Sequence, residues 1–487
     1  MTNKKFQQNG SILIQAVVFG GIAVIIIGAL VSWASVNIKA GRAALYREQA
    51  LQIAEAGIDY YRWHLAHSAV DYKDGTGQPG PYVHDFFDKD GIKIGTFTLT
   101  ITSPIVGSTL VTIQSDGNII TDPTIVRKIK VKLGKPSLAK YAVAANDSMR
   151  FGAGTEIFGP IHSNGGIRFD GLAHNLITSA KDKYDDPDHS GNNEFGVHTH
   201  VNAPPGSGTN DTFRAAEAPP SSIPSRSDVF VTGRLFPVPA IDFTGFTTDL
   251  AQIKANAQAG GKYISSSGAQ GYRVLFKTDD TFDVYKVNTL TSPPGGCSSS
   301  QTGWGTWSIK ATGGSQTFIA NYAIPANGLI FIEDNVWAEG QINTARATLA
   351  VGKFPDNPAT RPSITVNNNL LYTNYDGQDV LSLISQGDIN AGLSSADVLR
   401  IDAALIAQNG RIGRYYYSSN CGTGYTRNTI TLYGMLASNI RYGFAYTDGT
   451  GYATRNITYD GNLLYGPPPS FPLTSDQYSI ISWQEVY

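Results

Sequence analysis

Residues 11–36 read SILIQAVVFGGIAVIIIGALVSWASV, and this stretch decides how the rest of the chain is interpreted because it contains no charged residue. A helix rises about 1.5 Å per residue, so roughly 20 apolar residues cross the hydrocarbon layer of a bilayer. Lys4 and Lys5 precede the stretch, and positive residues tend to stay on the cytoplasmic side. The sequence therefore predicts a single-pass membrane protein that is anchored through residues 11–36, with a cytoplasmic N-terminus and an extracytoplasmic C-terminal domain.

The apolar stretch continues without proline into an amphipathic segment over residues 37–67. One face of that segment carries apolar residues at steps of three and four, namely Leu51, Ala54, Ile58, Tyr61 and Leu65. This spacing is typical of a helix, so we expect one continuous helix over 11–67. A secretory signal peptide would have a shorter apolar region of about 7–15 residues. An ordinary signal-anchor helix remains the alternative.

The N-terminal residues also resemble a known family. Lys4-Lys5, then Gln8-Asn9-Gly10 followed directly by Ser11-Ile12, is similar to the leader of a type IV prepilin. The segment Gln49–Ile58 resembles the pilin-like subgroup named after the PilX minor pilin. The resemblance implies that a prepilin peptidase cuts after Gly10 and that Ser11 becomes a new, methylated N-terminus. It also implies other pilin subunits and the pilus assembly machinery as partners.

Gln15 departs from the pattern of that family. Pilins usually carry Glu at the fifth mature position, where the carboxylate is thought to pair with the N-terminal amine of a neighbouring subunit. A buried ion pair that loses one partner is costly. Gln15 therefore favours a minor subunit at low copy number or at a filament tip over a uniform major subunit.

Composition limits the remaining function classes. Charged residues make up 16% of the chain and the net charge is −2, so charge gives no reason to expect nucleic-acid binding. The 52 Gly, 25 Tyr and 24 Pro residues suit short strands joined by tight turns. Cys297 and Cys421 are the two cysteines of the chain and lie in Gly/Ser-rich loops. They are either one disulfide in an oxidising compartment or two free thiols.

The sequence pattern after residue 67 predicts a mainly β protein. Residues 68–135 read as a polar connector followed by a small antiparallel sheet, because Thr96–Ile101 and Val126–Lys132 alternate apolar and polar residues. Such a sheet would pack on the end of the helix, as in the usual pilin arrangement.

A short pattern then recurs: apolar, any, small, any, Gly or Asn, any, apolar. It occurs at 161–167, 336–342 and 383–389, with longer or looser copies at 405–412 and 435–442. Short strands that end in Asn or Gly turns and recur about every 20 residues predict an irregular parallel β-helix. A β-sandwich with coincidental Asn-Gly turns is the alternative.

This pattern predicts three parts of the ectodomain. We expect first coils over 136–180 and a loop-rich and α+β insertion over 181–325, with a helix from Thr247 to Ala259 that ends at Gly260-Gly261. Further coils and a C-terminal cap would occupy 326–487, with one coil near 363–370 and Trp483 capping the last coil.

Two overlapping groups of residues are candidate metal ligands. Asp186, Asp188 and Ser190 stand at positions 1, 3 and 5 of a calcium-type loop, with Glu194 at position 9, but Val197 replaces the usual Glu at position 12. A plain polar surface loop is the alternative. His198 and His200 would lie on the same side of an extended strand near His189, and with a carboxylate they can hold zinc. Solvated histidines are the alternative, and no other cofactor is expected.

No sequence motif indicates catalysis. The chain lacks a nucleophile elbow, a zincin helix and a Walker loop, and no coil position repeats a pair of acids, so we expect it not to be an enzyme. The tyrosine-rich loops at 415–417 and 442–446 can stack on sugars or contact a host-cell surface. The sequence thus favours a minor type IV pilin-like structural protein of a pilus or cell surface, acting in filament assembly or tip adhesion. The alternative is a membrane-anchored β-helix protein that binds or degrades carbohydrate.

Overall fold

The structure is a computed structural model that describes residues 9–243, 245–305 and 308–486. The chain divides into two compact units. The helix unit consists of the residues up to Ser103, Val111–Gly134 and the residues from Gln477 onward. The head consists of Pro104–Leu110 and Lys135–Asp476.

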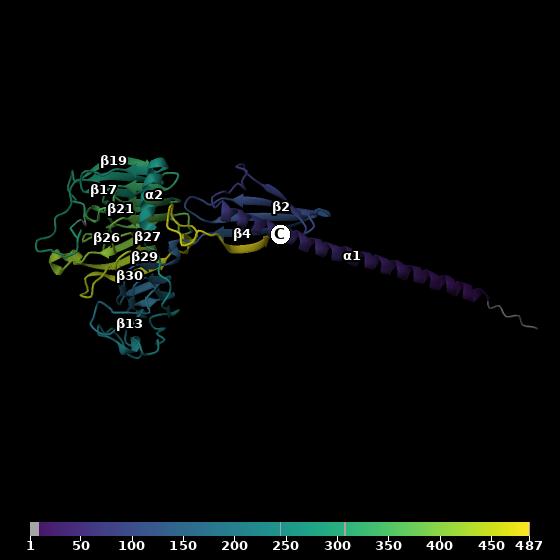
Figure 1. Cartoon of the computed structure of the whole chain (residues 1–487), viewed down its shortest axis with the longest axis horizontal. Coiled ribbons are helices and arrows are strands. Elements are labelled where there is room, and N and C mark those ends of the chain that lie inside the picture. Colours follow the sequence, from purple (N-terminus) through teal and green to yellow (C-terminus); the bar gives the residue numbers. More distant parts are fainter. Residues whose placement is uncertain (1–8, 244, 306–307, 487) are drawn as a thin grey trace, which may run out of the picture. The chain divides into compact units, whose positions relative to one another are not determined.

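The helix unit begins with one unbroken helix, α1 (Asn9–His67), as the sequence predicts (Figure 1). Its two halves have different surroundings. Residues 12–42 are exposed throughout, whereas the second half buries one apolar face formed by Ala50, Ile53, Ala54, Ile58, Tyr61 and Leu65. By length and composition the helix can cross a membrane, since its most apolar window has a mean hydropathy of 2.6.

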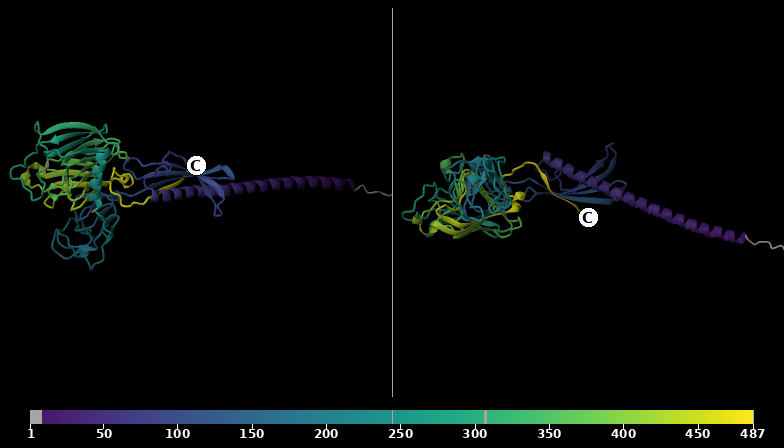
Figure 2. Two further views of the ribbon diagram at one scale, coloured as in Figure 1. Left: turned by 45° about the horizontal axis from the view of Figure 1, so that its top comes forward. Right: turned by 90° about the horizontal axis from the view of Figure 1, so that it is seen from below.

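A five-stranded antiparallel sheet packs on the buried face of α1 (Figure 2). In sheet order its strands are β1 (Tyr82–Phe87), β2 (Lys93–Thr102), β3 (Val111–Ile119), β4 (Asp122–Gly134) and β31 (Ser479–Val486). Residues of β3 alternate between buried and half-buried, which gives the sheet one apolar face for the helix. At Gly117 the strand approaches the helix so closely that a Cβ atom would lie 2.3 Å from the Ala50 carbonyl oxygen. The antiparallel sheet expected after the helix is therefore present.

The last strand of this sheet differs from the expectation. Trp483 does not cap a coil of the head; it lies in β31, opposite Val131 of β4. The pairing covers the edge of β4, which would otherwise present unpaired backbone groups. Sequence patterns are local and do not report a pairing between strands this far apart in the chain.

The head is built around one large, mostly parallel sheet. In chain order, the first strands of the head are β5 (Val143–Ala145), β6 (Met149–Phe151), β7 (Thr155–Phe158), β8 (Ile161–Ser163), β9 (Ile167–Phe169), β10 (Leu172–Ala173), β11 (Ile177–Ser179), β12 (Lys183–Tyr184), β13 (Glu194–Phe195), β14 (Val197–His198) and β15 (Arg234–Leu235). Among them, β12 and β13 form a separate two-stranded sheet, and β6, β9 and β14 form a separate three-stranded sheet. The next are β16 (Lys262–Ile264), β17 (Gly271–Phe276), β18 (Thr281–Val287), β19 (Gln316–Ala323), β20 (Leu329–Ile332), β21 (Val336–Ile342), β22 (Arg346–Val351), β23 (Ile364–Thr365) and β24 (Leu370–Tyr372). The last are β25 (Val380–Ser385), β26 (Ile389–Ala391), β27 (Val398–Ala407), β28 (Ile412–Arg414), β29 (Thr426–Ser438) and β30 (Gly451–Tyr459).

Parallel register places the recurring apolar residues in a column. Leu383 of β25 lies opposite Leu405 of β27, and Leu405 lies opposite Leu436 of β29. All three side chains are buried, so each strand covers the apolar face of the next. The strand expected near 363–370 is present as β23, which pairs with β21 and β26.

The order of the stack does not follow the sequence. β29 pairs with β5 and β30 pairs with β7, so the first strands of the head lie against its last ones. Figure 1 shows the strands in layers from β19 at one end to the loop-rich part with β13 at the other.

The expected insertion over 181–325 is not a separate body. β16 and β17 pair in parallel with β20 and β21 and extend the stack. The helix α2 (Gly245–Gly260) covers it with Leu250 and Ile253, which pack in one cluster with Phe331.

Candidate metal centre

The loop-rich part of the head brings polar residues together in its interior. β12 pairs antiparallel with β13, and β14 pairs in parallel with β9. These short pairings hold Glu194 at the start of β13 and His198 at the end of β14. Asp186 and His189 lie in the loop between β12 and β13, and His200 follows β14.

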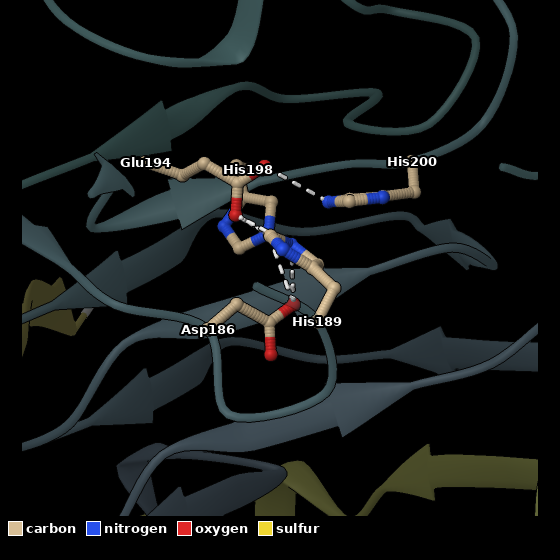
Figure 3. Close-up of side chains that lie close together, drawn as sticks. All are labelled: Asp186, His189, Glu194, His198 and His200. Carbon is tan, nitrogen blue, oxygen red and sulfur yellow. Dashed lines mark hydrogen bonds and ion pairs between the residues drawn. The ribbon is translucent and has the colours of Figure 1, made fainter. Parts of the chain in front are cut away.

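Five side chains converge there on one point (Figure 3). They are Asp186, His189, Glu194, His198 and His200, and one potential ligand atom from each lies within 4.8 Å of all the others. Glu194, His198 and His200 have no exposed surface, and Asp186 is 2% exposed. Polar groups buried this deeply are normally fully paired, so each contact in the cluster has to be accounted for.

Four of these atoms form a closely spaced set. His189 Nε2 lies 3.1 Å from Glu194 Oε2 and 3.5 Å from Asp186 Oδ2. His198 Nε2 lies at the same two distances from the same two oxygens, 3.1 Å and 3.5 Å. Two imidazole nitrogens and two carboxylate oxygens therefore face one another across a small common space.

Backbone contacts indicate which ring nitrogens carry hydrogen. His189 Nδ1 lies 3.3 Å from the Ser190 carbonyl oxygen, and His200 Nδ1 lies 2.5 Å from the Asn210 carbonyl oxygen. A carbonyl oxygen only accepts, so Nδ1 is the donor in both rings. In a neutral ring Nε2 then has a lone pair, yet the Nε2 of His200 lies 3.0 Å from Glu194 Oε1. Acceptors therefore face acceptors unless a cation lies between them or the rings carry a second proton.

His198 is the least satisfied member of the cluster. It is fully buried, and neither Nδ1 nor Nε2 has a hydrogen-bond partner, because its close approaches to the carboxylates lack hydrogen-bond geometry. Asp186 Oδ2 is likewise without a hydrogen bond. Leaving such groups unpaired in the interior costs about 1–3 kcal/mol each.

Charges around the cluster keep its carboxylates ionised. Burial alone would raise the pKa of Asp186, but contact with His198 and the backbone N–H of Asp188 outweighs it and holds the pKa well below its usual value. Burial would likewise raise the pKa of Glu194, but contact with the imidazole of His200 outweighs it, so this pKa is also lowered. Arg168, fully buried on β9, hydrogen-bonds Asp170 at 2.7 Å and leaves its Nη1 atom 3.7 Å from Asp186 Oδ2.

The structure brings together only half of the calcium-type set named from the sequence. Asp186 and Glu194 are in the cluster. The carboxylate of Asp188 instead pairs with Arg441 and Arg150, and Ser190 contributes only its backbone carbonyl to His189. The three histidines considered for zinc are all present. Sequence alone did not show that Asp186 and Glu194 belong with them, although the alternating His198 and His200 were a usable signal.

The processing and assembly residues lie far along the chain from this cluster. Most of the expected leader, residues 1–8, lies outside the described residues. Gly10 and Ser11 fall in the first turn of α1, and Gln15 is exposed on that helix.

The two cysteines and the aromatic loops form a second polar–apolar cluster in the head. Cys297 and Cys421 are joined by a disulfide. Tyr415 and Tyr417 pack with them and are 5% and 1% exposed. The Tyr415 and Tyr417 rings are therefore not available to stack on sugars, whereas Tyr416 is half-buried and packs edge-on against the half-buried Tyr446. Of the second loop, Tyr442 and Phe444 are also buried.

Comparisons with known proteins give little. No protein-family model and no curated protein matches the chain. Among solved structures, the competence-associated pilin ComZ from Thermus thermophilus is similar, with 14% identity and a TM-score of 0.30 over 91% of this chain and 98% of that one. At this TM-score the likeness carries no argument, so the proposals below depend on the chain's own residues.

Proposed function

We propose that the chain is a minor type IV pilin-like subunit with a PilX-type N-terminus, processed by a prepilin peptidase and displaying its head outside the membrane. The observation that carries the proposal is the division of α1 into a bare apolar half and a half that is packed on a sheet.

The exposed apolar half of α1 requires an apolar environment around it. Every large apolar side chain from Ile12 to Ile38 is exposed. Burial of one such side chain is worth roughly 1.5–3 kcal/mol, so ten of them outweigh the stability of about 5–15 kcal/mol that a typical domain has. A bilayer before assembly, and the apolar helices of neighbouring subunits afterwards, both supply that cover.

The packed half of α1 supplies a rigid connection to the sheet. Ala50, Ala54 and Gly117 are small residues at the contact, and the close approach at Gly117 leaves no room for a larger side chain. A helix fixed in this way on a small antiparallel sheet, with its first half free, is the arrangement expected of a pilin. We further propose that the stacked parallel strands of the head form an irregular parallel β-helix.

Gln15 supports a minor role. It is exposed on the free half of α1, at the position where a pilin usually carries Glu, and an amide cannot form the ion pair with a neighbour's N-terminal amine. Low copy number or a tip position does not require that pair. We propose no catalytic activity for this subunit, and the buried tyrosines give no support to the carbohydrate-binding alternative.

Replacement of Gly10 tests the processing step. In cells that contain the peptidase, mass spectrometry of the mature wild-type protein should find Ser11, methylated, as the first residue. Gly10→Val should leave the leader attached, whereas Gly20→Val, a matched change inside the apolar helix with open space around it, should be cut normally. Normal trimming of Gly10→Val, or a wild-type protein that begins elsewhere, would refute the prepilin assignment.

A further inference from the structure

We propose that the cluster in the loop-rich part of the head is a structural binding site for one divalent transition-metal ion of the zinc type, with Asp186, His189, Glu194 and His198 as its ligands. This inference is independent of the pilin-like function, because it depends only on residues of the head.

The four nitrogen–oxygen separations are close to the edge lengths of a tetrahedral site. Zinc binds imidazole nitrogen and carboxylate oxygen at about 2.0–2.2 Å. In a regular tetrahedron of that size, neighbouring ligand atoms are about 3.3–3.6 Å apart. The four nitrogen–oxygen separations are 3.1, 3.1, 3.5 and 3.5 Å. Only the His189 Nε2–Glu194 Oε2 contact has hydrogen-bond geometry. The other three contacts involve His198 Nε2 or Asp186 Oδ2, which have no hydrogen-bond partner, so the four contacts do not form a hydrogen-bond network.

The hydrogen positions fit the same ion. His189 donates its Nδ1–H to a backbone carbonyl, which is the usual way that a protein orients a metal-binding imidazole and leaves Nε2 free. His200 Nε2 lies against the second oxygen of Glu194 at 3.0 Å. Because its Nδ1–H is given to the Asn210 carbonyl, His200 orients that carboxylate from outside the set of four only when Nε2 also carries a hydrogen.

The donor chemistry selects the metal. Calcium takes six to eight oxygen ligands at about 2.3–2.6 Å, and magnesium prefers oxygen ligands and keeps several waters. Neither suits two nitrogens and two oxygens in a buried, closed space. A dication also balances the two buried carboxylates, which burial leaves costly when uncompensated.

A closed site of this kind is structural rather than catalytic. The four ligand side chains are at most 4% exposed, and a catalytic zinc keeps one position open for water or substrate. The ligands come from the β12–β13 loop, β13 and β14. Because these strands are only two residues long, the ion would be the main crosslink that orders this part of the head.

The test uses the full-length chain in detergent, purified through a tag without histidine. Elemental analysis should find about one zinc per chain. Treatment with a chelator should remove it and lower the thermal midpoint of the head, and added Zn²⁺ should restore the midpoint where Ca²⁺ and Mg²⁺ do not. Competition with a chromophoric chelator then measures affinity in the variants.

The variants separate ligands from neighbours. His198→Ala and His189→Gln should each weaken zinc binding by more than about 100-fold, whereas loss of the outer residue in His200→Ala should cost roughly 10–100-fold. His174→Ala is the matched control, since His174 lies in the same unit and pairs with Glu156 at 2.7 Å outside the cluster; its zinc affinity should equal that of the wild type. A folded wild-type chain that takes up no zinc at micromolar concentration would overturn the site in favour of protonated histidines. A His198→Ala or His189→Gln variant that binds like the wild type, or a chain stabilised by Ca²⁺ and not by Zn²⁺, would also overturn it. If His198→Ala does not fold, His189→Gln and the wild-type measurements decide.

Discussion

Reduction of the Cys297–Cys421 disulfide should destabilise the head strongly. The bond closes a loop of 124 residues. In the chain-entropy model a loop of that length restricts the unfolded chain by about 16–17 cal/mol/K, or about 5 kcal/mol at 25 °C. The bond also lies in a packed cluster with Leu393 and Tyr417, so its loss adds some packing cost. With a urea dependence of about 3 kcal/mol/M, the urea midpoint should fall by roughly 1.5 M.

Urea titration followed by brief proteolysis measures this midpoint on the full-length protein in detergent. Because the chain has two cysteines, any effect of a reductant on its own bonds acts at this disulfide. A Cys297→Ala/Cys421→Ala variant serves as the control: it should match the reduced wild type and be insensitive to reductant. Equal midpoints for the oxidised and reduced wild type would refute the argument that this bond restricts the unfolded head.

Two other predictions concern the burial of Leu405 in the apolar column and the pH dependence of stability at Asp460. Leu405→Ala should lower the free energy of unfolding by about 2–5 kcal/mol, because this side chain is 1% exposed in the apolar column. Val398→Ala on the same strand should change it by less than about 0.5 kcal/mol, because Val398 is 61% exposed. Equal urea midpoints for the two variants would contradict the register. Burial raises the pKa of Asp460, so the folded state favours the protonated carboxyl group. The stability that this group contributes is therefore present at low pH. It is lost as the pH rises above the ordinary carboxyl pKa of about 3.9. The wild type should therefore lose urea stability relative to Asp460→Asn as the pH rises above about 4, and a difference that stays constant with pH would contradict this.

Local patterns in the sequence were sufficient for the elements whose partners are nearby. The three-and-four spacing from Leu51 to Leu65 predicts the buried face of α1, and alternation predicts β2 and β4. The copies of the recurring pattern at 161–167, 336–342 and 383–389 coincide with β8, β21 and the end of β25. In each case a residue's environment depends on neighbours within a turn of helix or along one strand.

Pairings between distant segments could not be predicted in the same way. Nothing near Trp483 indicates that its strand joins β4, and nothing near Val143 indicates Leu436 as its neighbour. The candidate metal centre shows the same difficulty: Asp186 and Glu194 read as parts of an oxygen-rich loop until the fold places the histidines beside them. The burial of Tyr415 and Tyr417 could not be predicted because it depends on a loop more than a hundred residues earlier in the chain.

The pairing of β5 with β29 affects the order in which the head can form as the chain is synthesised. Strands that are synthesised early lack their neighbour until the late part of the chain has been made. Contacts between segments so far apart in sequence form slowly, and open strand edges meanwhile attract other chains. We therefore expect the nascent head to need a holding factor or a low local concentration, because its earliest strands reach their partners only when synthesis is nearly complete.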